Sequence, residues 1–252
     1  MSALLIDIGN TRVKWARDTA GCLGRSRAAR HAGWSTRKFE ALIGAGTRLE
    51  RIWVASVAGE QINAALVRAA QRRGAPAPQF VATRRKACGV TVAYLEPWRL
   101  GVDRFLGLIG ARAHFERLPL CVVGVGTAMT VDLLGADGRH RGGAIIPAPP
   151  LMISSLLDGT RGIRRRAQGG AKGSTVALFA RSTRSALEQG ARYAAAAAVD
   201  RAVEEARAVV GRAPLVVLTG GGAADLRPLI RSASLEVADL VLWGLAVWAR
   251  EG

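Results

Sequence analysis

The chain opens with an apolar run that ends in a turn, the pattern of a β-hairpin. Residues 3–8 are apolar except for Asp7, and Gly9-Asn10-Thr11 follows as a turn signal. Residues 13–16 then alternate between apolar and polar positions, like a strand that returns beside the first. The pattern predicts an N-terminal hairpin with Asp7 at the end of its first strand.

The same pattern recurs near the middle of the chain. Residues 120–123 form an apolar run, Gly124-Val125-Gly126-Thr127 is a tight turn, and residues 129–134 return. The strand–turn–strand pattern therefore occurs twice, about half a chain apart, which indicates a weak internal repeat.

Strand and helix patterns mix in both halves, which indicates an α/β fold with two related lobes. We assign residues 1–117 to an N-terminal lobe and residues 118–252 to a C-terminal lobe. Arginine, glycine and lysine without apolar periodicity predict a loop at 161–174. The other predicted strands are 51–57, 79–82, 142–147 and 215–219, and the predicted helices are 60–73, 103–115, 185–210 and 238–250.

The composition limits the classes of function. The 252 residues are 50% hydrophobic, yet no apolar run approaches the roughly 20 residues that span a bilayer. Three cysteines are too few, and odd in number, for a disulfide framework or a zinc site. The N-terminus lacks a basic segment and meets Asp7 at once, unlike a signal peptide. We therefore expect a cytoplasmic protein with no membrane partner.

The formal net charge of +17 raises one alternative, a regulatory or nucleic-acid-interacting factor without enzymatic activity. However, the 36 basic residues are spread along the chain, and aromatic residues make up only 5% of it. Few stacking platforms for single strands are then available, and we expect no specific nucleic acid partner. A surface of this charge attracts anionic substrates in general.

The first hairpin carries side chains suited to phosphate. A glycine lets the backbone approach a phosphate group, Asn10 and Thr11 add donors, and Lys14 adds a cation from the returning strand. Asp7 at the strand end can hold Mg²⁺, which prefers few carboxylates and several waters. The alternative is an ordinary hairpin with an Asx turn.

The segment Gly101-Val102-Asp103-Arg104 sets a carboxylate beside a guanidinium at the start of a predicted helix. Such an Asp is often only a cap. An Arg at the positive end of a helix dipole opposes the usual charge preference, unless it meets an anionic ligand such as a carboxylate. Asp103 is then placed to accept a hydroxyl proton.

The second hairpin offers a matching set of groups. Thr127 can bond a β- or γ-phosphate, and Asp132 on the returning strand can orient a metal or water, or cap the sheet edge. Neither the Walker loop nor the usual dinucleotide fingerprint is present, so these hairpins are the candidate phosphate sites.

Together these motifs resemble those of the type III pantothenate kinases, in the actin-like, acetate and sugar kinase superfamily. Asp7-x-Gly9-Asn10-Thr11-x-x-Lys14 looks like the family's first phosphate loop, and Gly101-x-Asp103-Arg104 is similar to its Gly-x-Asp-Arg motif. Gly126-Thr127-Ala128-x-Thr130-x-Asp132 looks like its second phosphate loop, and residues 142–147 resemble the strand that follows. The resemblance covers nearly the whole chain.

The resemblance implies two similar actin-like (ribonuclease H-like) lobes, each a mixed sheet flanked by helices, with a cleft between them. It implies an ATP-dependent phosphotransferase that moves the γ-phosphoryl group to the primary hydroxyl of pantothenate. The product is 4'-phosphopantothenate, in the first step of coenzyme A biosynthesis. The family also implies ATP with Mg²⁺, a monovalent cation such as K⁺ or NH₄⁺, and a homodimer.

Roles for individual residues follow from the same resemblance. The resemblance makes Asp103 the catalytic base, whereas Asp7 and Asp132 are candidate metal ligands from their own chemistry and position. Thr183 lies in a segment, 182–190, that matches the family's Asn-Thr segment. The implied ATP site comprises Asp7, Ile8, Gly9, Asn10, Thr11, Arg12, Val13, Lys14 and Thr127, and the implied pantothenate site comprises Tyr94, Gly101, Val102, Asp103, Arg104 and Thr183.

One departure from the family bears on the chemistry. Gly124 stands where the family usually has an Asp that helps to hold the monovalent cation, so this chain lacks that carboxylate. Another small-molecule kinase on the same scaffold, acting on a sugar or an acyl phosphate, is the second alternative. Gly101-x-Asp103-Arg104 with Tyr94 upstream favours pantothenate over it.

Overall fold

The computed structural model describes residues 2–251 apart from 31, 33, 45–48, 169–174 and 177. The chain forms two compact units. The first comprises Met1–Arg117, Asp137–Gly142 and Asp239–Gly252, and the second comprises Leu118–Ala136 and Gly143–Ala238. The division drawn from the sequence placed the last helix in the C-terminal lobe, whereas here it packs within the first unit.

A six-stranded sheet forms the centre of the first unit, in the order β3-β2-β1-β5-β6, with β4 also paired to β2. The apolar strand β1 pairs antiparallel with β2 and parallel with β5, and β5 pairs parallel with β6. A separate hairpin is formed by two short strands, β7 and β8. The strands are β1 (Ser2–Ile8), β2 (Arg12–Thr19), β3 (Cys22–Leu23), β4 (Arg27–Arg30), β5 (Arg51–Ser56), β6 (Pro78–Phe80), β7 (Lys86–Ala87) and β8 (Val90–Thr91).

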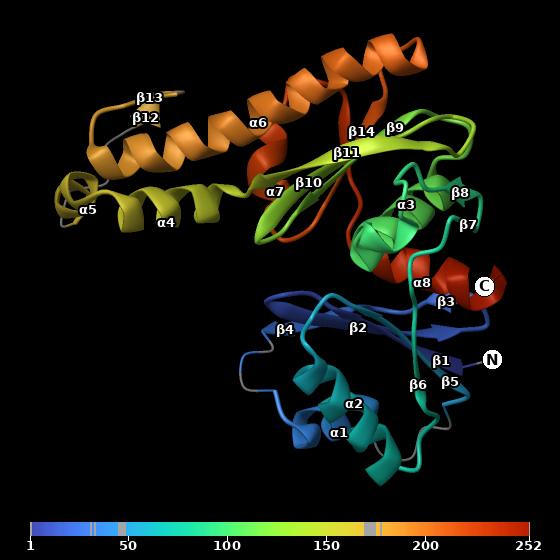
Figure 1. The fold of residues 1–252 in the computed structure, drawn as a ribbon. Helices are drawn as coiled ribbons and strands as arrows, with labels where there is room; N and C mark the ends of the chain where they lie inside the picture. The colour runs from blue at the N-terminus through green and yellow to red at the C-terminus, as the bar shows by residue number, and fades with distance from the viewer. Residues whose placement is uncertain are drawn as a thin grey trace. The chain divides into compact units, whose positions relative to one another are not determined.

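Helices cover both faces of this sheet (Figure 1). Alternate residues of β1, such as Leu4 and Ile6, pack with α1 and α2 in one buried cluster that includes Phe39 and Leu66. Helices α3 and α8 lie together on the other side, where α8 contacts β1, β2 and β5. The helices are α1 (Thr36–Ile43), α2 (Glu60–Arg72), α3 (Val102–His114) and α8 (Leu240–Glu251), with a 3-10 turn at Pro97–Arg99.

The second unit repeats this strand arrangement around a five-stranded sheet, in the order β11-β10-β9-β14-β15. Its central strand β9 pairs antiparallel with β10 and parallel with β14, as β1 pairs with β2 and β5. The internal repeat seen in the sequence is therefore a repeat of topology. The strands are β9 (Leu120–Val125), β10 (Ala128–Leu134), β11 (His140–Pro147), β14 (Leu215–Thr219) and β15 (Ser234–Glu236), with a small hairpin of β12 (Thr175–Val176) and β13 (Phe179–Ala180).

The long helix α6 (Thr183–Val210) packs on the second sheet (Figure 1). It begins two residues before the predicted start, because the Ser182 hydroxyl accepts a hydrogen bond from the Ser185 backbone N–H and caps the helix. It ends at Gly211, whose φ of 76° is the left-handed conformation favoured at helix ends. Its small residues, among them Ala195 and Val199, join the buried cluster formed with β9 and β14.

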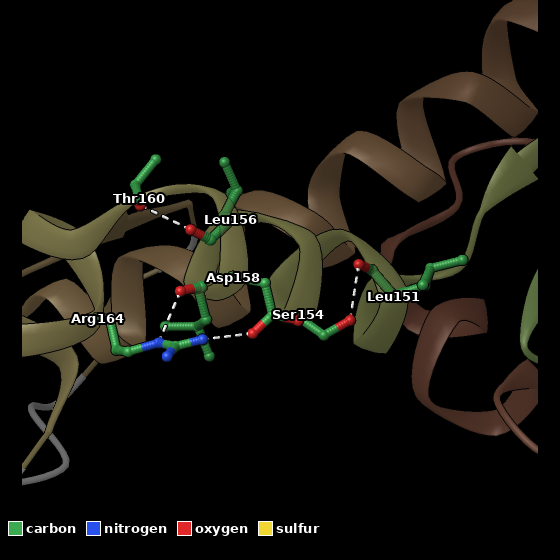
Figure 2. A network of polar contacts seen from close by, with 7 residues as sticks. Leu151, Ser154, Leu156, Asp158, Thr160 and Arg164 are labelled. Carbon is green, nitrogen blue, oxygen red and sulfur yellow. Dashed lines mark hydrogen bonds and ion pairs between the residues drawn. The ribbon is translucent and has the colours of Figure 1, made fainter.

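The prediction of a loop over 161–174 is wrong for its first half. Residues Arg161–Ala167 form the helix α5, which follows α4 (Pro149–Gly159). Arg164 links the two helices, because its Nε donates to the Leu157 carbonyl at 2.9 Å and its guanidinium pairs with Asp158 (Figure 2). Arginine and alanine also favour helix without any apolar periodicity. The rest of the predicted loop, 169–174, lies outside the described residues.

Most of the other predicted elements are confirmed with ends shifted by one or two residues. The remaining short elements are α7 (Ala223–Leu226) and a 3-10 turn at Arg227–Leu229, after the triple glycine at 220–222. Within the residues that the structure describes, no helix combines the length and apolar character needed to cross a membrane.

Candidate active site

The first predicted phosphate loop is the tip of the β1–β2 hairpin. The Gly9 backbone N–H donates to the Arg12 carbonyl at 2.9 Å and closes the turn, which leaves Asn10 and Thr11 exposed at the tip. A Cβ added at Gly9 would lie 3.5 Å from the Arg12 oxygen, an ordinary contact. The turn itself therefore does not require glycine at this position.

Asp7 is partly buried at the end of β1, opposite Lys14 in the antiparallel register. Desolvation raises the pKa of Asp7 to about 7, against the opposing charge of Lys14. The charges of Asp103 and Asp239 contribute to this rise, so these carboxylates lie close enough to act on one another. The structure thus brings two sequence-predicted residues, Asp7 and Asp103, into one electrostatic neighbourhood.

Sequence reasoning missed Asp239, which holds the Lys14 side chain. Lys14 Nζ donates to Asp239 Oδ1 at 2.9 Å, and the Ser26 hydroxyl donates to Oδ2. Partial burial alone would raise the pKa of Asp239, but the bonds from Ser26 and Lys14 outweigh it and leave that pKa below its usual value. The two partners lie 225 positions apart, so no local pattern connects them.

The Gly-x-Asp-Arg motif forms the start of α3, as predicted. The Asp103 Oδ1 atom accepts from the Arg104 backbone N–H at 2.8 Å, so the carboxylate folds back over the first turn of the helix. A Cβ at Gly101 would lie 2.5 Å from this oxygen, so the Asp103 carboxylate would have to shift to admit any other residue there. Gly101 occupies the N-cap position, and Asp103 lies in the first turn.

Arg104 is buried, with 8% of its surface exposed, and Tyr94 lies against it. Arg104 Nη1 donates to the Tyr94 hydroxyl at 3.0 Å, and the guanidinium carbon lies 5.6 Å from the centre of the tyrosine ring. The buried His140 stacks on the ring of Tyr94, and the centres of the two rings lie 5.9 Å apart. Two residues predicted for the substrate site are therefore in direct contact, and His140 is an addition that the sequence did not indicate.

The second predicted phosphate loop is the tip of the β9–β10 hairpin. The Gly126 N–H donates to the Ala128 carbonyl at 3.0 Å, and Thr127 is exposed. A Cβ at Gly126 would lie 3.6 Å from the Ala128 oxygen, again an ordinary contact. Asp132 lies farther along β10, opposite Val122 and 2% exposed, so it is a sheet residue and not part of the hairpin tip.

A cavity of about 670 Å³ opens beside the second hairpin within the same unit. Gly126 and Gly222 line it together with polar groups of α6 and α7, among them Glu188, Arg192 and Asp225. Arg192 Nη2 donates to the Asp225 carbonyl at 3.1 Å, whereas its buried Nε atom has no hydrogen-bond partner among the described residues. In the sequence, the triple glycine at 220–222 is only a turn signal after an apolar strand, and the spacing of the α6 residues gives no sign of a cavity.

Thr183 is the first residue of α6 and is partly buried. It belongs to the second unit, as Thr127 does, whereas Asp7, Tyr94, Asp103 and Arg104 belong to the first. Each unit therefore carries its own part of the predicted site. In the part of the chain that the structure describes, no group of three or more His, Cys, Asp or Glu side chains has the arrangement of a metal site.

Comparison with known proteins settles the family. The profile of the type III pantothenate kinases matches residues 3–205. The type III pantothenate kinase of Stenotrophomonas maltophilia (strain K279a) is 39% identical over 251 residues, which cover 99% of this chain and 98% of that protein. This chain belongs to the type III pantothenate kinase family. The corresponding protein of Nitrosococcus oceani is 34% identical over 98% of this chain and 94% of its own length.

Solved structures agree on the fold. The activator of the 2-hydroxyisocaproyl-CoA dehydratase from Clostridium difficile, with bound ADPNP, matches with a TM-score of 0.56 at 14% identity. The match covers 99% of this chain and 94% of that one. The expected fold class is confirmed: the type III pantothenate kinase chain is α/β, with two mixed sheets flanked by helices in the actin-like manner. Membership of this family assigns it an ATP-dependent kinase activity in coenzyme A biosynthesis.

Proposed function

We propose that this chain transfers the γ-phosphoryl group of ATP to the primary hydroxyl of pantothenate and releases 4'-phosphopantothenate. The observation that supports it best is the start of α3, where Asp103 and the buried Arg104 lie side by side and Asp103 neighbours Asp7. Phosphoryl transfer asks a protein mainly for positioning and for neutralisation of charge. The first unit supplies a group for each of these tasks.

Arg104 binds the pantothenate carboxylate in this proposal. A guanidinium forms two parallel hydrogen bonds to a carboxylate, and these bonds are strong where water is excluded. The Tyr94 hydroxyl and ring fix the direction in which the guanidinium points. The bound carboxylate sets which hydroxyl of pantothenate meets Asp103.

Asp103 accepts the proton of the attacking hydroxyl. Its carboxylate is held by the Arg104 backbone N–H, so its direction is set before substrate binds. General-base assistance of this kind contributes about 10²–10⁴-fold to a rate. The proton leaves the hydroxyl as its oxygen forms a bond to the γ-phosphorus, and the bond from that phosphorus to the bridging oxygen of ADP breaks.

Each unit carries one hairpin tip with groups suited to phosphate. Backbone N–H groups and the hydroxyls of Thr11 and Thr127 are donors for phosphate oxygens, and the cavity beside Gly126 and Gly222 holds the nucleoside. Cavities of about 300–1,000 Å³ with a few polar groups are typical of small-ligand sites. Arg192, which lines this cavity, supplies a guanidinium beside the nucleoside in this proposal.

Asp7 fits the requirements of a Mg²⁺ ligand. Mg²⁺ prefers one or two carboxylates together with phosphate oxygens and water. Burial raises the pKa of Asp7 to about 7, and a divalent cation would favour the ionised carboxylate at this position. When bound, Mg²⁺ neutralises charge on the transferred phosphate. Asp132 is buried in the sheet, and in our proposal it supports β10 behind the second loop.

A monovalent cation and a homodimer complete the proposal. Gly124 stands where the family usually has a cation-binding Asp, and an added Cβ there would lie 3.0 Å from Thr130 Oγ1. Because the carboxylate is missing, we expect the requirement for K⁺ or NH₄⁺ to be weak in this chain. The homodimer is supported by α4, all eleven residues of which are described and none of which is buried, although the helix is largely apolar.

The decisive experiment measures ATP consumption with and without pantothenate, and identifies the phosphorylated product by mass spectrometry. Asp103→Asn should lower kcat about 10²–10⁴-fold, with little change in KM for ATP. Parallel assays with and without K⁺ or NH₄⁺ test the cation. A panel of sugar and acyl acceptors tests the other kinases of this scaffold, and turnover confined to one of them would refute the proposed acceptor.

A further inference from the structure

One arginine holds the segment that carries Tyr94. Arg85 Nη1 donates to the Val92 carbonyl at 3.2 Å and to the Tyr94 carbonyl at 2.6 Å, and Nη2 donates to the Leu95 carbonyl at 2.6 Å. The backbone adds a further bond, because the Val92 N–H donates to the Arg85 carbonyl at 2.9 Å. The guanidinium thus gathers three carbonyls of residues 92–95, which form no helix or strand beyond Thr91.

This segment has little else to fix it from outside. Leu95 is 94% exposed, and Trp98, at the following 3-10 turn, is 66% exposed. On the inner side, the Ala93 N–H approaches His140 Nδ1 at 3.5 Å, and the His140 ring stacks on Tyr94. Tyr94 is therefore clamped between His140, which contacts its ring, and Arg85, which holds its backbone.

The position of Tyr94 in turn determines where the Arg104 guanidinium lies. The tyrosine hydroxyl accepts a hydrogen bond from Arg104 Nη1 at 3.0 Å, while its ring lies against the same guanidinium. A chain of contacts thus runs from Arg85 through the 92–95 backbone and Tyr94 to the buried Arg104. Every link in it joins residues of the first unit.

We propose that Arg85 is a positioning residue for substrate recognition, which fixes the 92–95 segment so that Tyr94 aims Arg104 at the substrate carboxylate. This inference rests on the function proposed above, because it takes the acceptor to carry a carboxylate. Arg85 touches no substrate in this account and acts only through Tyr94. No sequence motif marks it, since its partners are backbone carbonyls.

The geometry requires arginine and not merely a cation. Two nitrogens of one planar guanidinium reach different carbonyls at once, whereas a lysine ammonium is a single point with a flexible stem. Arg85→Lys keeps the positive charge but loses the fork, the pair of guanidinium nitrogens that bind separate carbonyls. Lys86→Gln is the matched control, because it removes a cation from the neighbouring exposed position and leaves the fork intact.

The first experiment compares steady-state kinetics of the wild type, Arg85→Lys and Lys86→Gln. Misplacement of a binding group by about 1 Å can cost 10²-fold, so Arg85→Lys should raise KM for pantothenate roughly 10- to 100-fold. KM for ATP should stay unchanged, and Lys86→Gln should match the wild type. A KM for pantothenate within twofold of the wild type in Arg85→Lys would overturn the proposal.

A double-mutant cycle with Tyr94→Phe tests whether Arg85 acts through the tyrosine. Tyr94→Phe removes the hydroxyl and keeps the ring that stacks on His140. The effects on KM should be clearly less than additive, because both changes break the same chain of contacts. Additive effects would show that Arg85 does not act through Tyr94.

Hydrogen exchange gives a readout that does not depend on catalysis. In Arg85→Lys without substrate, amides 92–95 should exchange faster, while those of α3 should keep the wild-type rate. If exchange at 92–95 is unchanged in Arg85→Lys while the wild type turns over pantothenate, only the role of Arg85 is refuted and the proposed function stands. A wild type that does not turn over pantothenate would refute the proposed function and the substrate role of Arg85 with it, whatever the exchange shows.

Discussion

The surroundings of Asp7 disfavour the charged form of its carboxyl group. Its carboxyl lies at the end of an apolar strand, and desolvation raises its pKa from 3.8 to about 7. The nearby carboxylates of Asp103 and Asp239 add to the effect, and Lys14 only partly offsets it. In the proposed role of Asp7 as a Mg²⁺ ligand, a bound divalent cation would favour the ionised carboxylate.

Asp7→Asn should therefore stabilise the fold above neutral pH. The folded-state pKa is above the unfolded one, so the folded protein holds the proton more tightly, and the wild type loses stability as pH rises from about 4 to 7. Each unit of pKa displacement corresponds to about 1.4 kcal/mol, which makes the effect a few kcal/mol. Urea unfolding at pH 4 and pH 8 measures it, and an equal difference between variant and wild type at both pH values would contradict the prediction.

The loop glycines lead to a second prediction at this scale. Because a Cβ at Gly9 meets only the Arg12 oxygen at 3.5 Å, Gly9→Ala should fold with a melting temperature near that of the wild type. The methyl group would lie where the phosphates approach, so KM for ATP should rise about tenfold or more while KM for pantothenate changes little. The twin substitution Gly126→Ala should behave alike. A loss of folding in either variant would show that the turn needs its glycine.

At the residue scale, the sequence supports prediction only where a group's partners are close in the chain. Gly101, Asp103 and Arg104 form one local motif, and the structure joins them as the motif suggested. Asp239 and Arg85 could not be predicted, for different reasons. Asp239 pairs with Lys14, which lies 225 positions away in the chain. Arg85 binds backbone carbonyls, which every residue possesses.

At the element scale, the crossing of α3 and α8 depends on two glycines. A Cβ at Gly244 would lie 2.0 Å from the Leu106 carbonyl oxygen, and one at Gly110 would lie 2.4 Å from the Leu240 oxygen. The helix backbones therefore touch directly at both positions. Because α3 begins with the Gly-x-Asp-Arg motif, this crossing also sets where Asp103 lies relative to β1.

Gly244→Ala should destabilise the protein by at least about 1–3 kcal/mol, because backbone atoms cannot move aside for the new methyl group as a flexible side chain would. Gly107→Ala is the control on the same helix pair, since its Cβ meets nothing within 4 Å. It should leave stability unchanged or raise it by up to about 1 kcal/mol through helix propensity. Thermal unfolding of both variants tests this, and equal melting temperatures would refute the close crossing.

Elements with periodic apolar faces were predictable, and those without them were not. The strands of both hairpins and the helices α2, α3 and α6 have the expected spacing and are confirmed. Helix α5 has no apolar stripe, and its arginines face solvent. It is joined to α4 by the hydrogen bond of Arg164 to the Leu157 carbonyl. Short edge strands such as β3 and β15 leave too few residues for any pattern to show.

At the scale of the whole molecule, the net charge of +17 bears on both substrates and on self-association. ATP and pantothenate are anions, and a positive surface raises their local concentration at low ionic strength. The same charge opposes the approach of a second copy of the chain. Any dimer must therefore gain enough from apolar contact to overcome this repulsion.

The exposed apolar side chains of α4 are the surface that we expect to supply this contact. Leu151 is 40% exposed and Leu156 is 45% exposed, on a helix with no buried residue. Leu156→Glu should convert the dimer that we propose to monomers. Val209→Glu, at a 58% exposed position near the end of α6, is a matched control that should stay dimeric.

Salt should strengthen the wild-type dimer, because the Debye length falls from about 30 Å at 0.01 M to about 8 Å at 0.15 M ionic strength and like charges then repel less. Analytical ultracentrifugation at both concentrations measures the dissociation constant. An interface held by ion pairs would respond in the opposite direction, since screening weakens attraction between unlike charges as well. A dimer that weakens with salt and survives Leu156→Glu would therefore place the contact away from α4, whereas one that tightens with salt and is lost in that variant would locate it there.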